Sequence, residues 1–535
     1  MVYADLESRS RLVSDLEIRN SGKQQKEIKL QVKEQAALLS EKIDAIIAGA
    51  GSLLPELLLA GFFLLLVTLD LFKSKTIKQM LPWLALTGLF SAFVLQILGG
   101  YTSSGVQFLN LLRSDGLARY GGILFSAAGI FTILLSLQSR SLENLKEGKG
   151  EYYALILMLV LGLNLMAKSI NLLMVFLAIE VVSIASYILT LTLKHEKRAV
   201  EAGLKYILYG TLSAGVMLYG MSFFYGFTGS LNYTEGTFWQ ALLQADYLLV
   251  TIAAILVFAG FFFKISAAPF HFWVPDIYQG APMPIVALFS TGPKMAGIIV
   301  ILRFIAAFND PAVASYFDDI LWFLGIAALA TLAIGNFTAL WQKTPRRLMA
   351  YSSVSHAGFL LMALLAFGTN YSSGVLFYLS VLLFMNYGIF LFLQITEENF
   401  GVTKLEHFTG LGHKLPYLGI MALLYLLSLT GLPPLAGFMG KLLIFSNVWE
   451  AYSSSNQTML LVLLVAGVLL TGVALFYYIR IPYYLFFKRN YTEEKLVISL
   501  SNKLLLGFFA LPLLVLFFKP DLLLHWIEKL LAQTL

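Results

Sequence analysis

The amino-acid sequence predicts an all-α polytopic membrane protein with about fourteen transmembrane helices. Of its 535 residues, 58% are hydrophobic and only 13% are charged, whereas soluble domains carry about 25% charged residues. Apolar runs of about 20 residues, the length that a helix needs to cross the bilayer, recur along the chain. Lysine and arginine gather in alternate loops between these runs, as in other polytopic membrane proteins. No strand pattern accompanies them.

The apolar runs predict fourteen spans. In order they are 52–73, 79–100, 118–138, 152–168, 170–193, 200–227, 247–268, 285–308, 317–341, 346–367, 373–395, 416–449, 458–487 and 500–518. The first run starts after about fifty residues and is long enough to remain as a helix, so no cleavable signal is expected.

Loop charges predict the orientation of the spans. The loops after odd-numbered spans carry Lys73, Lys75, Lys78, Arg140, Lys146, Lys149, Lys194, Lys197, Arg198, Lys343, Arg346, Arg347, Lys404, Lys414, Lys488, Arg489 and Lys495. The loops after even-numbered spans carry only Arg113, Arg119 and Lys168. Basic loops stay on the inner side, so both termini are expected outside. The formal charge of +6 is explained by these loops and does not indicate a nucleic-acid partner.

Composition also bounds the cofactors. The chain has no cysteine, which excludes disulfides, thiolate metal sites and cysteine-held iron–sulfur clusters. No spacing of histidines or carboxylates suggests a metal or haem site. No cofactor is therefore expected in this chain.

Two of the predicted spans are interrupted beside a lysine. Span 7 contains "FAGFFFKISAAPFHFWVPDIYQGAP", in which Lys264 precedes three prolines, and span 12 contains "SLTGLPPLAGFMGKLLIF", in which Lys441 follows two. Proline removes a backbone donor, and in lipid the freed carbonyls need partners or a wet cavity. The two breaks lie five spans apart and therefore run in opposite directions across the membrane. Such a pair is typical of an inverted-repeat transporter.

Six ionisable residues lie inside the predicted membrane region. They are Glu180, Lys205, Lys264, Lys294, His356 and Lys441. A charge at the bilayer centre costs about 2.5–3.5 kcal/mol on insertion scales, so each of them needs a reason to be there. Arg303, nearer the end of its helix, is interpreted as structural.

Structural alternatives exist for three of these residues. Lys205 can extend its amine to the interface or pair with Glu201 four residues earlier. Glu180 can belong to a static buried pair, and His356 can form an interhelical hydrogen bond. For the other three lysines, the scarcity of buried acids makes fixed partners harder to find.

The chemistry that buried amines favour is proton transfer. The pKa of a lysine, about 10.4 in water, falls when the side chain is moved out of water. A buried lysine can then gain and lose a proton near neutral pH, and a neighbouring charge can change which state it adopts. The six residues, joined by water that the helix breaks admit, are therefore predicted to carry protons across the membrane.

Four segments carry a resemblance to a known family: "GSLLPELLLAGFFLLLVTLDLF", "FFFKISAAPFHFWVPDIYQGAPMPI", "RRLMAYSSVSHAGFLL" and "GLPPLAGFMGKLLIF". They closely resemble the N-type antiporter-like subunit of respiratory complex I, the NADH:quinone oxidoreductase. The resemblance covers roughly residues 52–520. The L- and M-type subunits and the multisubunit sodium/proton antiporters share the "PFH.W.PD" core but lack "YQGAP".

The resemblance implies fourteen helices with two inverted five-helix repeats, helices 4–8 and 9–13, in which helices 7 and 12 are broken. The corresponding regions are a charged N-terminal extension (1–51), helices 1–3 (52–151), the first repeat (152–308), the second repeat (309–488) and helix 14 with the C-terminal tail (489–535). The extension departs from the family's usual short start, and its "KEQAALLSEKIDAIIA" segment predicts a surface or partner-contacting helix.

The family's proton-path residues match the six residues named above. By the resemblance, Glu180 and Lys205 form a switchable pair that sets the proton affinity of Lys264, and the proton passes through Lys264, Lys294 and Lys441 with His356 on helix 10. The M-type subunit has a glutamate where this chain has Lys441, which agrees with the N type.

The resemblance also implies the partners and the location. M-type and K-type subunits are expected as neighbours, with an L-type subunit in the same membrane arm, in the inner membrane of a bacterium. NADH, FMN, iron–sulfur clusters and quinone are expected to bind partner subunits.

Two other functions stay open at this point. The first is a subunit of a multisubunit cation/proton antiporter, with the same proton path and an added sodium site. The second is a structural subunit whose buried lysines only hold helices and partners together.

Overall fold

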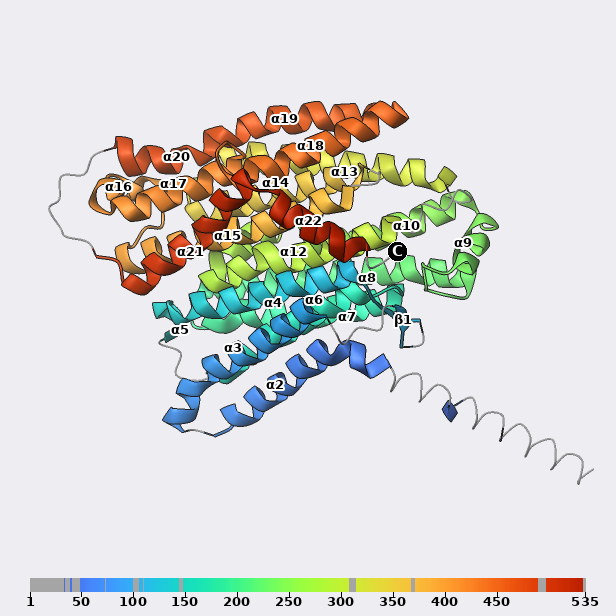
Figure 1. Ribbon diagram of the computed structural model, residues 1–535, viewed down its shortest axis with the longest axis horizontal. Helices are drawn as coiled ribbons and strands as arrows, with labels where there is room; N and C mark the ends of the chain where they lie inside the picture. The colour runs from blue at the N-terminus through green and yellow to red at the C-terminus, as the bar shows by residue number, and fades with distance from the viewer. Residues whose placement is uncertain are drawn as a thin grey trace, which may run out of the picture.

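The protein is a bundle of helices that lie along one common direction (Figure 1). The computed structural model describes residues 33, 39–40, 49–72, 74–99, 105–108, 110–143, 148–306, 314–366, 371–488 and 497–532. The predicted N-terminal extension, 1–51, lies almost wholly outside these residues. A short antiparallel hairpin, β1 (Gly105–Gln107) and β2 (Leu112–Ser114), is the only sheet in the described part of the chain. The sequence predicted no strand at all, so the hairpin is a correction.

A helix occupies each of the fourteen predicted ranges. These helices are α2 (Leu54–Asp70), α3 (Lys75–Leu98), α4 (Gly116–Leu137), α6 (Lys149–Lys168), α7 (Leu172–Thr190), α8 (Lys197–Thr228), α10 (Tyr247–Ile265), α12 (Met283–Ala306), α13 (Ala314–Leu340), α14 (Pro345–Leu364), α15 (Tyr371–Phe400), the pair α17 (Pro416–Thr430) and α18 (Ala436–Ser455), α19 (Thr458–Tyr478) and α21 (Leu500–Phe518). Shorter helices connect or extend them: η1 (Gly51–Leu53), α5 (Arg140–Glu143), η2 (Leu191–Leu193), α9 (Gly236–Leu243), α11 (Val274–Gly280), η5 (Leu405–Phe408), α16 (Leu411–Lys414), α20 (Arg480–Pro482), η6 (Tyr483–Phe487) and α22 (Asp521–Leu531).

Twelve helices in the described residues are long and apolar enough to cross a membrane. Two of the fourteen predicted spans are not among them, and both are unusual in composition or shape. The helix α14 carries serines 352, 353 and 355 and His356 along its length, which lowers its hydropathy. The other span is divided into α17 and α18, and neither half alone is both long and apolar enough to cross a membrane.

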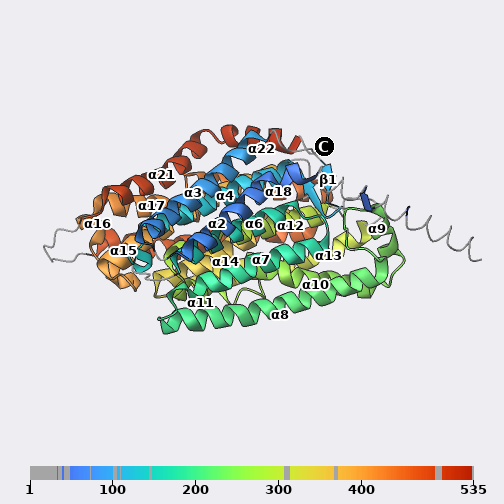
Figure 2. The same cartoon turned by 90° about the horizontal axis from the view of Figure 1, so that it is seen from below.

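Two helices form the centre of the bundle. The most apolar stretch of α12 is buried along its whole length, and that of α15 is 94% buried. The most apolar stretches of α2, α19 and α21 are only 28% buried. The helices α2 and α19 lie at the edges of the bundle in Figure 1, and α21 lies at its edge in Figure 2. A helix that is apolar on all sides belongs in the interior, so a lysine on α12 is surrounded by protein and not by lipid.

The first helix break follows Lys264. The helix α10 ends at Ile265, Ser266 adopts a left-handed conformation with φ 65°, and α11 begins at Val274. The carbonyls that the break frees are satisfied by protein donors, as the bilayer interior requires. The Ala267 amide donates to Phe262 O at 2.9 Å, and Trp273 Nε1 donates to Phe263 O at 3.1 Å.

Replacing Trp273 with phenylalanine is expected to lower the free energy of unfolding by about 1 kcal/mol, because it removes one of the two donors to the buried Phe263 carbonyl and leaves only the Ser266 amide. The ring that stacks on Tyr206 at 4.7 Å would remain. The thermal unfolding midpoint of the purified protein measures this loss. Trp341→Phe is the control, because the Trp341 side chain is 82% exposed. An equal midpoint for the two variants would contradict the prediction.

The second helix break precedes Lys441. The helix α17 ends at Thr430, Gly431 has φ 87°, and α18 begins at Ala436. A Cβ atom at Gly437 would lie 1.8 Å from the Ser428 carbonyl oxygen, so only glycine allows the two halves to approach this closely. The Gly437 amide also donates to Ser428 Oγ at 3.1 Å.

The two broken helices run in opposite directions through the bundle. Figure 2 shows α10 to the right of α11, whereas α17 lies to the left of α18. Since α10 precedes α11 and α17 precedes α18 in the chain, the first pair runs from right to left and the second from left to right.

Candidate functional site

Four of the six predicted site residues are deeply buried and two are not. Lys264, Lys294, His356 and Lys441 are each at most 5% exposed, whereas Glu180 and Lys205 are partly exposed. The buried four come from α10, α12, α14 and α18, the two broken helices and the helices that follow or face them.

Lys264 lies in the last turn of α10, directly before the first break. Its Nζ donates a hydrogen bond to Ser183 Oγ on α7 at 2.8 Å. Glu180 lies three residues before Ser183 on the same helix, and its charge and that of Lys264 are close enough to interact. The structure therefore brings Glu180 and Lys264 together around one face of α7.

Lys294 lies in the middle of the buried helix α12. Its Nζ donates to the backbone oxygen of Ser353 on α14 at 2.8 Å and to Ser353 Oγ at 2.5 Å. The Tyr278 hydroxyl on α11 donates to the same Oγ at 3.0 Å. Ser353 thus joins Lys294 to the short helix after the first break.

His356 lies one turn beyond Ser353 on α14. Its Nδ1 is 2.7 Å from the Tyr378 hydroxyl on α15, and its Nε2 is 3.2 Å from the Tyr478 hydroxyl on α19. The Tyr478 hydroxyl is also bonded to Ser352. His356 lines the same small cavity as Lys294, and its ring and Lys441 Nζ both contact the Phe359 ring, so the imidazole is near both amines.

A small cavity separates Lys294 from His356. About 10 Å³ of it is accessible to the centre of a water molecule, and its lining includes Ser290, Lys294, Ser353, His356 and Asn386. A cavity of about this size with several polar partners can hold one water. One water there would complete a hydrogen-bonded connection between the amine and the imidazole.

Lys441 follows the second break. Its Nζ donates to the Thr430 carbonyl at 2.8 Å and lies 4.5 Å from the centre of the Phe359 ring. Thr430 is the last residue of α17, so its carbonyl has no acceptor role within that helix. The break therefore supplies the polar partner of the lysine beside it.

Lys205 contacts two other carboxylates in this structure and not Glu180, so the switchable pair that the family resemblance implied stays a prediction. Its Nζ lies 2.7 Å from Glu201 on the same helix and 2.9 Å from Asp276 on α11. The neighbouring Tyr206 packs against Tyr187, with ring centres 4.9 Å apart, and Tyr187 is seven residues, about 10 Å, along α7 from Glu180. Among the described residues no ion pair within 4.0 Å involves Glu180.

Several residues that complete these contacts could not be predicted from the sequence. They are Asp276, Tyr278, Ser353, Tyr378 and Tyr478. Asp276 carried one usable signal, because it is a carboxylate directly after a proline in the broken segment. The serine and the tyrosines carried none, because the chain has 26 tyrosines and hydroxyls are common in membrane helices.

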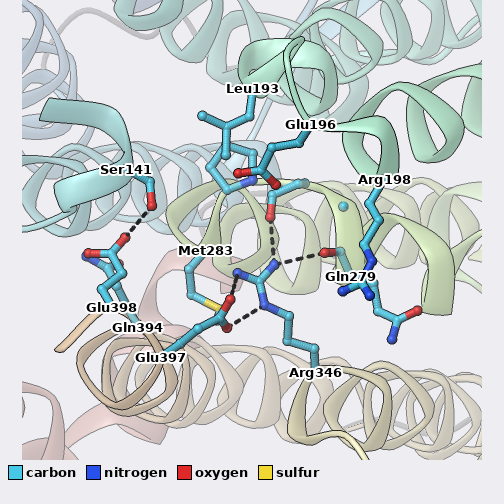
Figure 3. Close-up of a pocket in the computed structure, with 13 residues that line it drawn as sticks. Ser141, Leu193, Glu196, Arg198, Gln279, Met283, Arg346, Gln394, Glu397 and Glu398 are labelled. Atoms are coloured by element: carbon cyan, nitrogen blue, oxygen red, sulfur yellow. Dashed lines mark hydrogen bonds and ion pairs between the residues drawn. The ribbon is translucent and has the colours of Figure 1, made fainter. Parts of the chain in front are cut away.

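A polar cavity of about 120 Å³ opens at the end of the bundle where α14 begins and α15 ends (Figure 3). Arg346 occupies its centre, with Nε 2.7 Å from Glu397 and Nη1 2.9 Å from the Ala281 carbonyl. On the far wall Glu398 accepts from Ser139 and Ser141. The remaining lining residues are Leu193, Glu196, Arg198, Gln279, Gly280, Pro282, Met283 and Gln394.

We call it the inner cavity, because the loop charges predict that this end of the bundle faces the inner side of the membrane, and it has the features of a hydrated vestibule. Its volume suffices for several water molecules. Gln394 Oε1 is buried in its wall without a hydrogen-bond partner in the described structure, which leaves an acceptor for water. Arg198 and Arg346, which line it, lie at the starts of α8 and α14 and are among the basic residues that predicted the inner side of the membrane.

Comparison with known proteins identifies the family. Residues 169–471 match the family described as NADH:quinone oxidoreductase/Mrp antiporter, TM. The chain is 36% identical over 496 residues to NADH-quinone oxidoreductase subunit N 2 of Chloroherpeton thalassium, covering 91% of this chain and 95% of that protein. It is 35% identical over 484 residues to NADH-quinone oxidoreductase subunit N of a Geobacillus species, covering 89% of this chain and 97% of that protein.

Solved structures have the same fold. A chain of respiratory complex I from Thermus thermophilus matches with a TM-score of 0.71 and 29% identity over 88% of this chain and 99% of that one. A chain of an archaeal membrane-bound sulfane sulfur reductase matches in fold alone, with a TM-score of 0.80 and 22% identity over 90% of this chain and 97% of that one. With these matches covering nearly its whole length, the chain belongs to the family of N-type antiporter-like membrane subunits of NADH:quinone oxidoreductase.

Proposed function

We propose that the chain translocates protons as a membrane-arm subunit of NADH:quinone oxidoreductase, driven by redox chemistry in its partner subunits. One observation carries the proposal. Lys264, Lys294 and Lys441 are buried, yet within the described residues none has a carboxylate within 4.0 Å. An amine in a fixed ion pair keeps its proton, whereas an amine that contacts hydroxyls and carbonyls can release it.

The proposed path runs between the two helix breaks. Protons reach Lys294 from the inner cavity. The wall of that cavity includes Gln279, and the residue directly before it, Tyr278, is hydrogen-bonded to Ser353, which also bonds Lys294. From Lys294 the proton passes through the single-water cavity to His356 and then to Lys441. Lys264, beside Glu180, exchanges protons with Lys294 and responds to the charge of Glu180.

The fold supports a symmetrical arrangement of this path. Fourteen spans with two inverted five-helix repeats, spans 4–8 and 9–13, would place one broken helix in each repeat. The opposite directions of the two broken helices and the lysine beside each break agree with that arrangement. In this arrangement Lys264 and Lys441 hold equivalent positions in the two repeats.

The redox groups would belong to other subunits. NADH, FMN, iron–sulfur clusters and quinone would bind partners, with M-type and K-type subunits as neighbours and an L-type subunit in the same arm. The chain would lie in the bacterial inner membrane, with the inner cavity facing the cytoplasm and both termini outside. Changes of charge in the neighbours would drive the change of state at Glu180 and Lys205.

The intact complex reconstituted into vesicles tests the proposal. The chain should copurify from native membranes with subunits that oxidise NADH and reduce quinone. NADH oxidation should then move protons across the vesicle membrane, an uncoupler should abolish the gradient, and exchange of sodium for potassium should leave the rate unchanged. Copurification without any redox subunit would overturn the proposal.

A cation/proton antiporter subunit is the second candidate, because the matching family is described as including Mrp antiporters. A chain of the Mrp complex from a Dietzia species also has this fold, with a TM-score of 0.73 at 19% identity over 91% of this chain and 98% of that one. Sodium-dependent proton flux in vesicles that contain neither NADH nor quinone would favour this candidate.

A further inference from the structure

The helix α11 carries two polar side chains that contact different parts of the protein. The Asp276 carboxylate binds two cations: Oδ2 lies 2.9 Å from Lys205 Nζ on α8, and Oδ1 lies 3.7 Å from Arg347 Nη1 on α14. The Tyr278 hydroxyl donates to Ser353 Oγ, which also accepts from Lys294. One short helix therefore contacts both the partly exposed Lys205 and the deeply buried Lys294 site.

The two side chains leave α11 on different faces. Residues two apart on a helix differ in direction by about 200°. Tyr278 is fully buried, whereas the Asp276 side chain is 30% exposed. A displacement of α11 at its Asp276 face would therefore move the Tyr278 hydroxyl relative to Ser353.

The helix α11 is fastened to both of its neighbours. A Cβ atom at Gly280 would lie 2.6 Å from the Arg198 backbone oxygen, so the end of α11 presses directly on the start of α8. Arg346 donates to the carbonyls of Tyr278, Gln279 and Ala281 and so connects the same end to α14. With its backbone held at this end, α11 transmits a change at Asp276 as a unit.

We propose that Asp276 is a positioning residue that couples the charge of Lys205 to the hydrogen bonds of Lys294 through α11. The inference rests on the proposed proton path and adds a connection to it. Lys205 cannot contact Asp276 and Glu180 at the same time. Its neighbour Tyr206 packs against Tyr187, and Tyr187 lies about 10 Å along α7 from Glu180. When Lys205 leaves Asp276, the carboxylate retains only Arg347, and α11 is drawn toward α14, where Ser353 and Lys294 lie.

Asp276→Asn in the assembled complex tests this coupling. Asparagine keeps the size of the side chain and removes its charge, so protons pumped per NADH should fall at least about threefold, while the amount of assembled complex stays the same. Asp276→Glu should retain most of the pumping. Glu201→Gln is the matched control, because it removes the other carboxylate bound to Lys205. The Glu201 side chain is 65% exposed, so this change should alter pumping by less than about twofold.

A double variant separates coupling from simple support. In the double variant Lys205→Met with Asp276→Asn, the loss of pumping should be no larger than the larger of the two single losses, because both changes interrupt the same connection. Additive losses, or an Asp276→Asn complex that is scarce but pumps normally per molecule, would overturn the inference.

Arg347→Gln keeps the inference testable if Asp276→Asn fails to assemble. It leaves the Lys205–Asp276 contact and removes the contact of Asp276 with α14, so pumping should fall in the same direction. Unchanged pumping would count against the inference. Failure of the proton path itself is recognised separately, because then Lys294→Met would also pump normally.

Discussion

Replacing Lys294 with methionine is expected to lower NADH-driven proton translocation per assembled complex by about tenfold or more. Methionine matches the length of lysine but has no proton to transfer, and Lys294 lies in the middle of the proposed path. The fold should persist, because no charged partner is left behind. The Tyr278 hydroxyl still donates to Ser353 Oγ after the change. Proton uptake in vesicles, divided by the amount of complex on a native gel, measures the effect.

Two further variants distinguish a role of Lys294 in proton transfer from a static hydrogen-bonding role. Lys294→Arg keeps a cation and several donors but cannot release its proton at neutral pH, so it should fail as methionine does. A static hydrogen-bonding role would instead tolerate it. Lys503→Met, at an exposed position on α21, should pump as the unaltered protein does. Normal pumping by Lys294→Met would remove Lys294 from the path.

The sequence could predict the helices well, because each needs only one property, an apolar run that is long enough to cross the membrane. A run of apolar residues must form a helix in lipid, since no other open structure satisfies its backbone. The prolines beside Lys264 and Lys441 predicted both breaks for the same reason, and both are confirmed. The polar helix α14 is predictable because "SSVSHAG" is followed by the apolar run "FLLMALLAF". The hairpin at 105–114 was missed because three-residue strands leave no periodic pattern.

The partners of the charged residues could not be predicted from the sequence. Lys264 contacts a serine hydroxyl and Lys441 a backbone carbonyl, and neither acceptor differs in sequence from the many others nearby. Lys205 could be matched to Glu201 by the four-residue spacing of a helix, and this contact is confirmed. Its second partner, Asp276, lies 71 residues away, and only the direction of α11 after the break brings it close.

Arg303 shows what a buried charge looks like when it has a fixed partner. Its Nη1 and Nη2 lie 2.6 and 2.7 Å from the two oxygens of Asp115, and its Nε and Nη2 also donate to the Ala167 carbonyl. Burial alone would raise the pKa of Asp115, but the charge and hydrogen bonds of Arg303 outweigh it and hold that pKa below its usual value. These bonds use four of the five guanidinium N–H donors and include both oxygens of a carboxylate, unlike the contacts of the three buried lysines, so Arg303 joins α12 to the start of α4 and the end of α6.

Replacing Arg303 with methionine is expected to destabilise the protein by about 3–5 kcal/mol, because it leaves the Asp115 carboxylate buried and unpaired. That is a large part of the total stability of a typical protein, so little folded chain should reach the membrane complex. The amount of subunit in purified membranes and the temperature of thermal inactivation measure the loss. Pumping per surviving complex should stay close to normal, which distinguishes Arg303 from Lys294.

The double variant Arg303→Met with Asp115→Asn should recover more than half of that stability. Asparagine removes the unpaired charge and still caps α4, where Asp115 now accepts from the Ala118 amide at 2.9 Å. Recovery should be incomplete, because the Ala167 carbonyl loses its donors. Since the pKa of Asp115 is lowered by folding, the contribution of the pair should be constant across roughly pH 5–8 and disappear only as the pH falls through that lowered pKa. A double variant as unstable as Arg303→Met would show that the lost packing of the guanidinium, and not the abandoned carboxylate, sets the cost.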